Sequence, residues 1–241
     1  MRIPVATLND GHDLPLLGLG TYKLQGGDVE PVVRAAIELG YRHIDTAAFY
    51  GNEVEVGAAV NAAIAAGDVT REELFITTKL WNDDQHRAAQ AYQESLSRLN
   101  LEFIDLYLIH WPWPQRGSYV HAFEQIVQLQ DRGQLRSVGV ANFYEEVLDE
   151  VIAATGVTPG LNQVEVHVGF TQPELRAYHS ELGILTEAWA PLARGENFTA
   201  PEIAAVADKH GKTPAQIVLA YLIELGCSVV PKTSNMQRLG E

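Results

Sequence analysis

Eight short apolar segments, separated by stretches of helical periodicity, constrain the fold of this 241-residue chain more than any other feature. The segments lack the alternation of half-exposed strands, which is typical of parallel strands covered on both faces. Strict alternation of strand and helix favours a closed (β/α)8 barrel, the TIM-barrel fold, over an open doubly wound sheet. The predicted strands are Leu16–Leu19, Arg42–Asp45, Leu74–Thr78, Ile104–His110, Leu135–Val140, Leu161–Val164, Ile184–Glu187 and Ser228–Val230.

The two ends of the chain add to this picture. Pro4–Leu14, with Asn9-Asp-Gly11 at its centre, is typical of a β-hairpin, which we expect to plug the bottom of the barrel. No Pro/Gly/Ser-rich linker interrupts residues 1–241, so we expect a single domain. Only Pro231–Glu241 follows the last predicted strand, fewer than a full barrel helix and tail require, so the eighth helix and C-terminal tail are expected to be missing.

Two sequence patterns predict where helices begin. Thr171-Gln-Pro-Glu174 is typical of a capping box with proline in the first turn. Thr213-Pro214 predicts an N-cap followed by proline at the first helical position.

Charge and cysteine content narrow the possible partners. The formal net charge is −14, from 31 acidic and 17 basic residues, which argues against binding to a nucleic-acid backbone. The single cysteine, Cys227, excludes an intrachain disulfide and lies in an apolar run, where we expect it to be buried. No signal-peptide core or membrane-length apolar run is present, so we expect a cytoplasmic protein without a membrane partner.

Ionisable residues stand at the ends of three consecutive predicted strands. Asp45, Lys79 and His110 follow apolar stretches there, and Tyr50 lies five residues beyond Asp45. Function in such barrels collects at the carboxyl ends of the strands. A buried ammonium needs a countercharge, which Asp45 can supply to Lys79. The ammonium is then expected to lower the pKa of Tyr50 and make its phenol a better proton donor.

This set can supply a proton but contains no activated nucleophile and no evident metal-ligand set. Reduction of a carbonyl also needs a hydride, which must come from a cofactor. Each residue alone has a structural explanation: a helix cap for Asp45, a surface aromatic for Tyr50, an ion pair for Lys79 and a core histidine for His110. Their joint position at neighbouring strand ends favours an active site.

Contiguous motifs follow one another along the chain: Gly40-Tyr-Arg-His-Ile-Asp-Thr-Ala-Ala-Phe-Tyr-Gly-Asn-Glu53, Ile76-Thr-Thr-Lys-Leu-Trp81, Asp105-Leu-Tyr-Leu-Ile-His-Trp-Pro112, Gly139-Val-Ala-Asn-Phe143, Asn162-Gln-Val-Glu-Val-His167, Glu187-Ala-Trp-Ala-Pro-Leu192 and Pro231-Lys-Thr-Ser-Asn-Met-Gln-Arg238. These motifs resemble those of the aldo-keto reductases, and most closely the bacterial branch that includes 2,5-diketo-D-gluconate reductases. The resemblance covers essentially the whole chain, in order.

The resemblance implies NADPH-dependent reduction of aldehydes or ketones, with Asp45, Tyr50, Lys79 and His110 as a catalytic tetrad and Tyr50 as general acid. NADPH would lie across the barrel mouth, in agreement with the absence of a G-x-G-x-x-G motif. Trp189 would stack on the nicotinamide, and Asn142 and Gln163 would bind its carboxamide. The implied cofactor-binding residues are Gly20, Thr21, Tyr22, Asp45, Asn142, Gln163, Trp189, Ala190, Pro191 and Leu192, with Lys232, Thr233, Ser234 and Arg238 for the adenosine 2′-phosphate.

Substrate contacts follow from the same placement. We expect the substrate site to be lined by Tyr22, Phe49, Tyr50, Trp81, His110 and Trp111. Ala141 stands where the family usually has serine, so weaker carboxamide binding is expected. The family is usually monomeric, and the same state is expected here.

Two other functions fit parts of the sequence. One is a non-catalytic subunit that binds NADP(H) and regulates another protein. The other is a metal-dependent barrel hydrolase that uses His110, Glu165 and His167, which lie on or just past two of the strands. The reductase itself is expected to need no metal.

Overall fold

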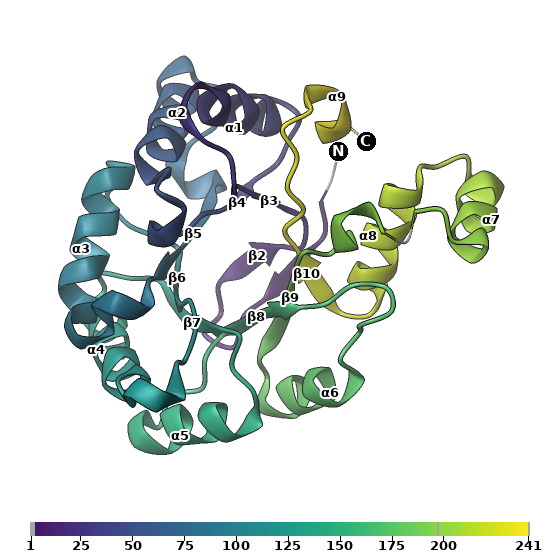
Figure 1. Ribbon diagram of the computed structural model, residues 1–241. Helices are drawn as coiled ribbons and strands as arrows, with labels where there is room; N and C mark the ends of the chain where they lie inside the picture. Colours follow the sequence, from purple (N-terminus) through teal and green to yellow (C-terminus); the bar gives the residue numbers. More distant parts are fainter. Residues whose placement is uncertain (1–2, 197, 241) are drawn as a thin grey trace.

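The fold is a ring of eight parallel strands, seen in a computed structural model that describes residues 3–196 and 198–240. The strands follow one another around the ring in chain order, and a bridge between Leu17 and Val229 brings the last beside the first (Figure 1). The predicted barrel is therefore confirmed. Its strands are β3 (Gly18–Gly20), β4 (His43–Asp45), β5 (Phe75–Leu80), β6 (Leu106–Ile109), β7 (Ser137–Ala141), β8 (Leu161–Glu165), β9 (Leu185–Trp189) and β10 (Cys227–Val229).

Helices surround this ring (Figure 1). One α-helix lies between each pair of successive strands from β3 to β9, and the described residues between β9 and β10 form two α-helices. The helices are α1 (Val29–Glu38), α2 (Glu53–Ala66), α3 (Ala88–Leu99), α4 (Tyr119–Asp131), α5 (Glu145–Thr155), α6 (Pro173–Leu182), α7 (Pro201–His210), α8 (Pro214–Glu224) and α9 (Met236–Leu239). In the described part of the chain, β10 is followed by the four-residue α9 alone, as the short remainder after the last strand predicts.

The predicted N-terminal hairpin is present as β1 (Val5–Thr7) paired antiparallel with β2 (Asp13–Pro15). Leu8 and Leu14 are buried in one cluster with Leu106 and Leu161 of the barrel strands. The hairpin therefore covers the amino-terminal end of the barrel with apolar side chains and leaves the carboxyl end, the mouth, for polar residues.

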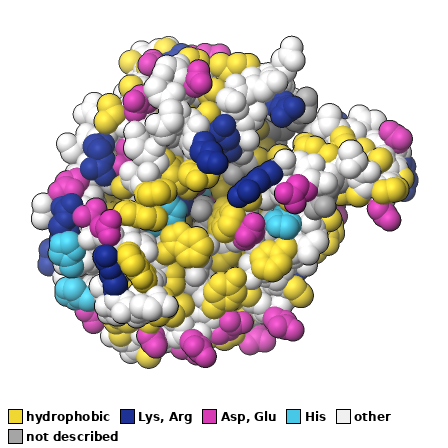
Figure 2. Space-filling view, in the orientation of Figure 1, with side chains coloured by type: hydrophobic (Ala, Val, Ile, Leu, Met, Phe, Trp, Pro, Cys, Tyr) yellow, Lys and Arg dark blue, Asp and Glu magenta, His cyan; other side chains and the backbone are white. Residues whose placement is uncertain are grey.

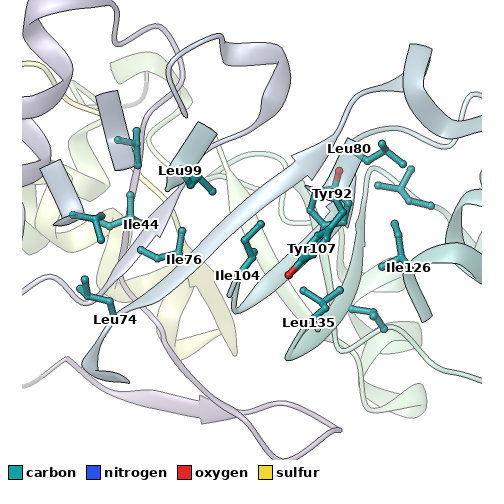
Figure 3. Close-up of a cluster of buried hydrophobic side chains, with 14 of the residues drawn as sticks. Ile44, Leu74, Ile76, Leu80, Tyr92, Leu99, Ile104, Tyr107, Ile126 and Leu135 are labelled. Carbon is teal, nitrogen blue, oxygen red and sulfur yellow. The ribbon is translucent and has the colours of Figure 1, made fainter. Parts of the chain in front are cut away.

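The main hydrophobic core lies between the strands and the surrounding helices (Figure 3). Ile44 of β4 and Ile76 of β5 belong to this outer core, and Tyr107 of β6 meets Tyr92 of α3 with ring centroids 5.2 Å apart. Successive side chains of a strand point to opposite faces. Because Ile44 faces outward, its neighbour Asp45 faces into the barrel.

One of the two predicted helix caps is wrong. At α8, Thr213 is the N-cap and Pro214 follows it, as predicted, and the Gln216 N–H lies 3.2 Å from the Thr213 hydroxyl in a capping box that was not predicted from the sequence. At α6 the N-cap is Gln172, with a φ of 44° and no side-chain cap, so Thr171 does not cap the helix. The Gln172 amide instead donates to the carbonyl of Glu165, which ties the start of α6 to the end of β8.

The close packing of α2 on α3 yields a stability prediction. A Cβ at Gly57 would lie 2.1 Å from the backbone carbonyl oxygen of Leu99, which cannot move aside as a flexible side chain could. Gly57→Ala should therefore lower the free energy of unfolding by at least about 2 kcal/mol, although alanine favours helix by about 1 kcal/mol. Urea denaturation measures this change. Gly27→Ala, where the added methyl meets nothing within 4 Å, is the control; equal stability of the two variants would contradict the packing argument.

Candidate active site

Three neighbouring strands position the ionisable residues at the barrel mouth. Asp45 is the last residue of β4, Lys79 lies near the end of β5, and His110 directly follows β6. The backbone N–H of His110 donates to the carbonyl of Leu80, which continues the pairing of β5 with β6 beyond the strand ends. Tyr50 ends a short 3-10 helix, Ala48–Tyr50, that turns the chain back over the mouth.

The ammonium of Lys79 is the centre of the site and is completely buried. Its Nζ lies 2.7 Å from each carboxylate oxygen of Asp45, 2.9 Å from the carbonyl oxygen of Thr46 and 3.4 Å from the hydroxyl of Tyr50. Burial of a charge is tolerated when it is paired and its hydrogens have acceptors. The predicted pair of Lys79 with Asp45 is confirmed, and it places Tyr50 beside a fixed positive charge.

The predicted direction of the Tyr50 pKa shift is wrong. Burial raises the pKa of Tyr50 and outweighs the lowering by the Lys79 ammonium, while the nearby Asp45 carboxylate raises it further. For Lys79, burial lowers the pKa, but the charges of Asp45, Tyr50 and Glu187 raise it more, so the net pKa shift is upward. At neutral pH the site therefore presents a neutral phenol next to an ammonium.

His110 is held in its neutral form. Burial, followed by the charge of Lys79, lowers its pKa to about 3. Its Nδ1 is buried without a hydrogen-bond partner among the described residues. The imidazole can therefore orient a bound oxygen through a neutral N–H, but it cannot serve as a charged acid.

Aromatic side chains pack around His110 and Tyr50, among them three of the residues expected to line a substrate site. Phe49 stacks on Trp81 with ring centroids 3.9 Å apart, and Trp81 meets the His110 ring edge-on at 5.2 Å. Tyr22 packs against Tyr50 at 5.1 Å. Tyr22, Phe49 and Trp111 are each about half exposed. Figure 2 shows hydrophobic side chains gathered around a central hollow on the face in view, with Lys and Arg side chains at its border.

Asn142, which we expect to bind the nicotinamide, connects other residues of the site. It follows β7 with a φ of 63°, and its side-chain amide donates to the carbonyl of His110 at 2.9 Å. Its Oδ1 accepts a hydrogen bond of 2.8 Å from the indole N–H of Trp189. Asn142 thus connects the half-buried Trp189 ring with the backbone that carries His110.

Gln163 of β8 lies on the other side of Asp45. Its Nε2 is 2.9 Å from Oδ2 of Asp45 and 2.7 Å from Oε1 of Glu187, so two carboxylates share one amide. These two contacts bring Gln163 next to Asp45 of the predicted tetrad.

The chain leaves β9 through a turn, residues 190–192, in which Ala190 has a φ of 49°.

The end of β3 contacts the residues that follow β10 at the mouth. The N–H of Gly20 donates to the carbonyl of Pro231 at 2.9 Å, and a Cβ at Gly20 would lie 2.7 Å from the carbonyl oxygen of Val230. The hydroxyl of Thr21 is buried and donates to the backbone carbonyl of Asp45. Gly20 and Thr21 therefore shape the mouth through the backbone.

The predicted phosphate-binding residues lie in the exposed segment after β10. Among the residues that the structure describes, neither Lys232 nor Arg238 forms an ion pair, and Ser234 is exposed. The hydroxyl of Thr233 accepts a hydrogen bond of 3.0 Å from the N–H of Asn235. Two cations without a countercharge, close together on the chain, fit an anionic group.

Sequence reasoning missed a buried polar group behind the tetrad. Glu187 of β9 accepts hydrogen bonds from Gln163 and from Ser228 of β10, and His43 Nδ1 lies 3.8 Å away. Its signal was a charged residue in a strand that is otherwise covered on both faces. Glu187 had no predicted role beyond its place in a motif, because no pattern along the chain shows which side chains lie beside it on the neighbouring strands.

The structure does not assemble the metal site of the hydrolase alternative. His167 Nε2 is 3.7 Å from Glu165, but within residues 3–196 and 198–240 no three His, Cys, Asp or Glu side chains lie together as metal ligands would. Over the same ranges, no helix has the length and apolar character needed to cross a bilayer.

Comparison with known proteins agrees with this geometry. Residues 16–241 match the model of the aldo/keto reductase family. The chain is 47% identical to an aldo-keto reductase of Mycolicibacterium smegmatis over 98% of this chain and 85% of that one. It is 46% identical to the methylglyoxal reductase DkgA of Salmonella typhimurium over 98% and 86% of the two chains. A mutant of Gox0644 in complex with NADPH superposes with a TM-score of 0.94 at 40% identity, over 100% of this chain and 86% of that one. The family predicted from the motifs is confirmed: this chain belongs to the aldo/keto reductase family.

Proposed function

We propose that this protein reduces aldehydes and ketones to alcohols, with Tyr50 as the proton donor. Membership of the family makes the chain an NADPH-dependent oxidoreductase. The observation that carries the assignment to Tyr50 is the position of its hydroxyl, 3.4 Å from an ammonium that Asp45 holds in place.

The residues of the chain divide the work on the carbonyl oxygen. When bound, NADPH supplies the hydride that the carbonyl carbon receives. Tyr50 donates its proton to the oxygen as negative charge develops there, and Lys79 stabilises the phenolate left behind. Asp45 keeps Lys79 charged and in place, while the neutral imidazole of His110 orients the oxygen. Half-exposed aromatic rings at the mouth exclude water from these steps.

The polar groups around the mouth fit the cofactor that the family uses. Trp189 offers a ring for the nicotinamide, and Asn142 and Gln163 offer side-chain amides to its carboxamide. Gly20, Thr21 and Tyr22 line the approach on one side. Ala190, Pro191 and Leu192 follow β9, where we propose that they contact the pyrophosphate. The 2′-phosphate is assigned to Lys232, Thr233, Ser234 and Arg238.

Small carbonyl compounds are the proposed substrates, bound between Tyr22, Phe49, Trp81 and Trp111. The name of the DkgA relative, a methylglyoxal reductase, makes dicarbonyls the first compounds to test, together with diketo-gluconates. We further propose that the chain acts as a single domain and a cytoplasmic monomer that binds no nucleic acid.

The role of Tyr50 predicts the effect of Tyr50→Phe. The variant should lose turnover of an aromatic aldehyde by about 10²–10⁴-fold, because the general acid is removed while the ring remains. Its Kd for NADPH, measured by quenching of tryptophan fluorescence, should change less than about threefold. Tyr221→Phe, at a half-exposed tyrosine of α8, is the control and should retain full turnover. Full turnover by Tyr50→Phe would refute this assignment, and NADPH binding without turnover in the parent would favour the regulatory alternative.

The protonation states predict the pH dependence of kcat/KM for reduction. Tyr50 must be protonated to donate its proton. Because its pKa is raised above the usual value of about 10, activity should be lost only as pH rises through that raised pKa. His110, with a pKa of about 3, is neutral throughout the physiological range. The profile should therefore be level between pH 6 and 9, measured with correction for NADPH decay. An inflection near pH 6.5 that His110→Asn removes would contradict the neutral imidazole.

The exposed cations after β10, Lys232 and Arg238, predict the basis of cofactor choice. Lys232→Ala should raise the Kd for NADPH about tenfold and leave the Kd for NADH within twofold, because only NADPH carries the 2′-phosphate. Lys209→Ala, at an exposed lysine of α7, controls for the loss of a surface charge. Equal weakening of both cofactors would place the 2′-phosphate elsewhere.

A further inference from the structure

Glu187 is a buried carboxylate that the proposed reaction does not use. It lies in the middle of β9, in register with Gln163 of β8 and with Ser228 of β10. Residues in register on neighbouring parallel strands point to the same side of the sheet. The three side chains therefore form one polar layer inside the barrel, directly behind Asp45.

The contacts of Glu187 leave its carboxylate in one orientation. Its side chain is fully buried. Oε1 accepts the hydrogen bond from Gln163 at 2.7 Å, and Oε2 accepts one from the Ser228 hydroxyl at 2.9 Å. A buried carboxylate costs stability unless it is well paired, and an apolar residue of the same volume avoids that cost. Packing alone does not account for a glutamate in this layer.

The partner of Glu187 shows what the carboxylate does. Gln163 has two amide hydrogens, and its Nε2 lies within hydrogen-bond distance of Glu187 on one side and Asp45 on the other. Carboxylate oxygens accept these bonds, whereas a flipped amide would set its own oxygen against them. The direction of the Gln163 amide is therefore determined, and its carbonyl Oε1 is the end left to accept a hydrogen bond.

We propose that Glu187 is a positioning residue that fixes the Gln163 amide so that its carbonyl accepts a hydrogen bond from the amino group of the nicotinamide carboxamide. This inference rests on the proposed function, because it presumes a nicotinamide beside Gln163. Burial raises the pKa of Glu187. Oε1 remains an acceptor for Gln163 in either protonation state, so the role does not depend on titration.

The proposal predicts how the protein distinguishes two oxidised cofactors. NADP⁺ carries the carboxamide amino group, whereas its 3-acetylpyridine analogue has a methyl group in that position and cannot donate. A site built to accept a hydrogen bond rejects the analogue that lacks the donor. The parent protein should bind NADP⁺ about tenfold more tightly than the analogue, with both Kd values measured by tryptophan fluorescence.

The variants separate positioning from packing. Glu187→Leu should lower this tenfold preference by at least about threefold, because the Gln163 amide loses one of its two constraints. Glu187→Gln keeps an acceptor oxygen for Gln163 and should retain the preference. The Kd ratio compares two ligands on the same folded protein, so partial unfolding does not alter it. If Glu187→Leu does not fold, Glu187→Met, whose flexible side chain adapts to irregular space, gives the same test.

A matched control removes a buried hydrogen bond from the outer core instead of the barrel interior. Tyr92→Phe deletes the α3 hydroxyl that donates to the carbonyl of Gln134, so it should change stability but not the Kd ratio. An unchanged ratio in Glu187→Leu would overturn the positioning role while NADP⁺ binding preserves the proposed function. If the parent binds neither cofactor, the proposed function fails and the inference fails with it.

Discussion

The ion pair between Lys79 and Asp45 is the interaction on which the rest of the site depends. An ammonium with no exposed surface requires a countercharge and acceptors for its hydrogens, and it finds them in the Asp45 carboxylate and the Thr46 carbonyl. The parallel pairing of β4 with β5 brings the two side chains to the same end of the barrel. It also places a positive charge 3.4 Å from the hydroxyl of Tyr50.

The barrel separates apolar from polar side chains by the alternation of its strands. Ile44 and Ile76 face the helices and build the outer core, whereas Asp45, Gln163 and Glu187 face inward. The hairpin covers the amino-terminal end of the barrel with the buried side chains of Leu8 and Leu14. The same alternation that stabilises the fold therefore delivers the reactive groups to one end of it.

The outline of the fold and the meeting of Asp45, Tyr50, Lys79 and His110 at the mouth could be predicted because both leave local signals. Apolar runs mark strands, and Lys79 at the end of such a run is conspicuous among only five lysines. The errors concern interactions that are not local. The prediction that Thr171 caps α6 was wrong because the side-chain amide of Gln172 donates a hydrogen bond to the end of β8. The pKa of Tyr50 was predicted to shift in the wrong direction because its burial depends on distant parts of the chain, such as the rings of Tyr22 and His110 that pack against it.

The sequence by itself determined the order of strands and helices, the family, and the residue types at the strand ends, because each follows from periodicity or from a contiguous motif. Only the tertiary structure decided the protonation of Tyr50 and His110 and the partnership of Gln163 with two carboxylates. Asp45 and Glu187 are 142 residues apart in sequence and share the Gln163 amide because β8 lies across the ring from β4 and beside β9. Burial and hydrogen-bond geometry are properties of such distant neighbours, and no local pattern along the chain encodes them.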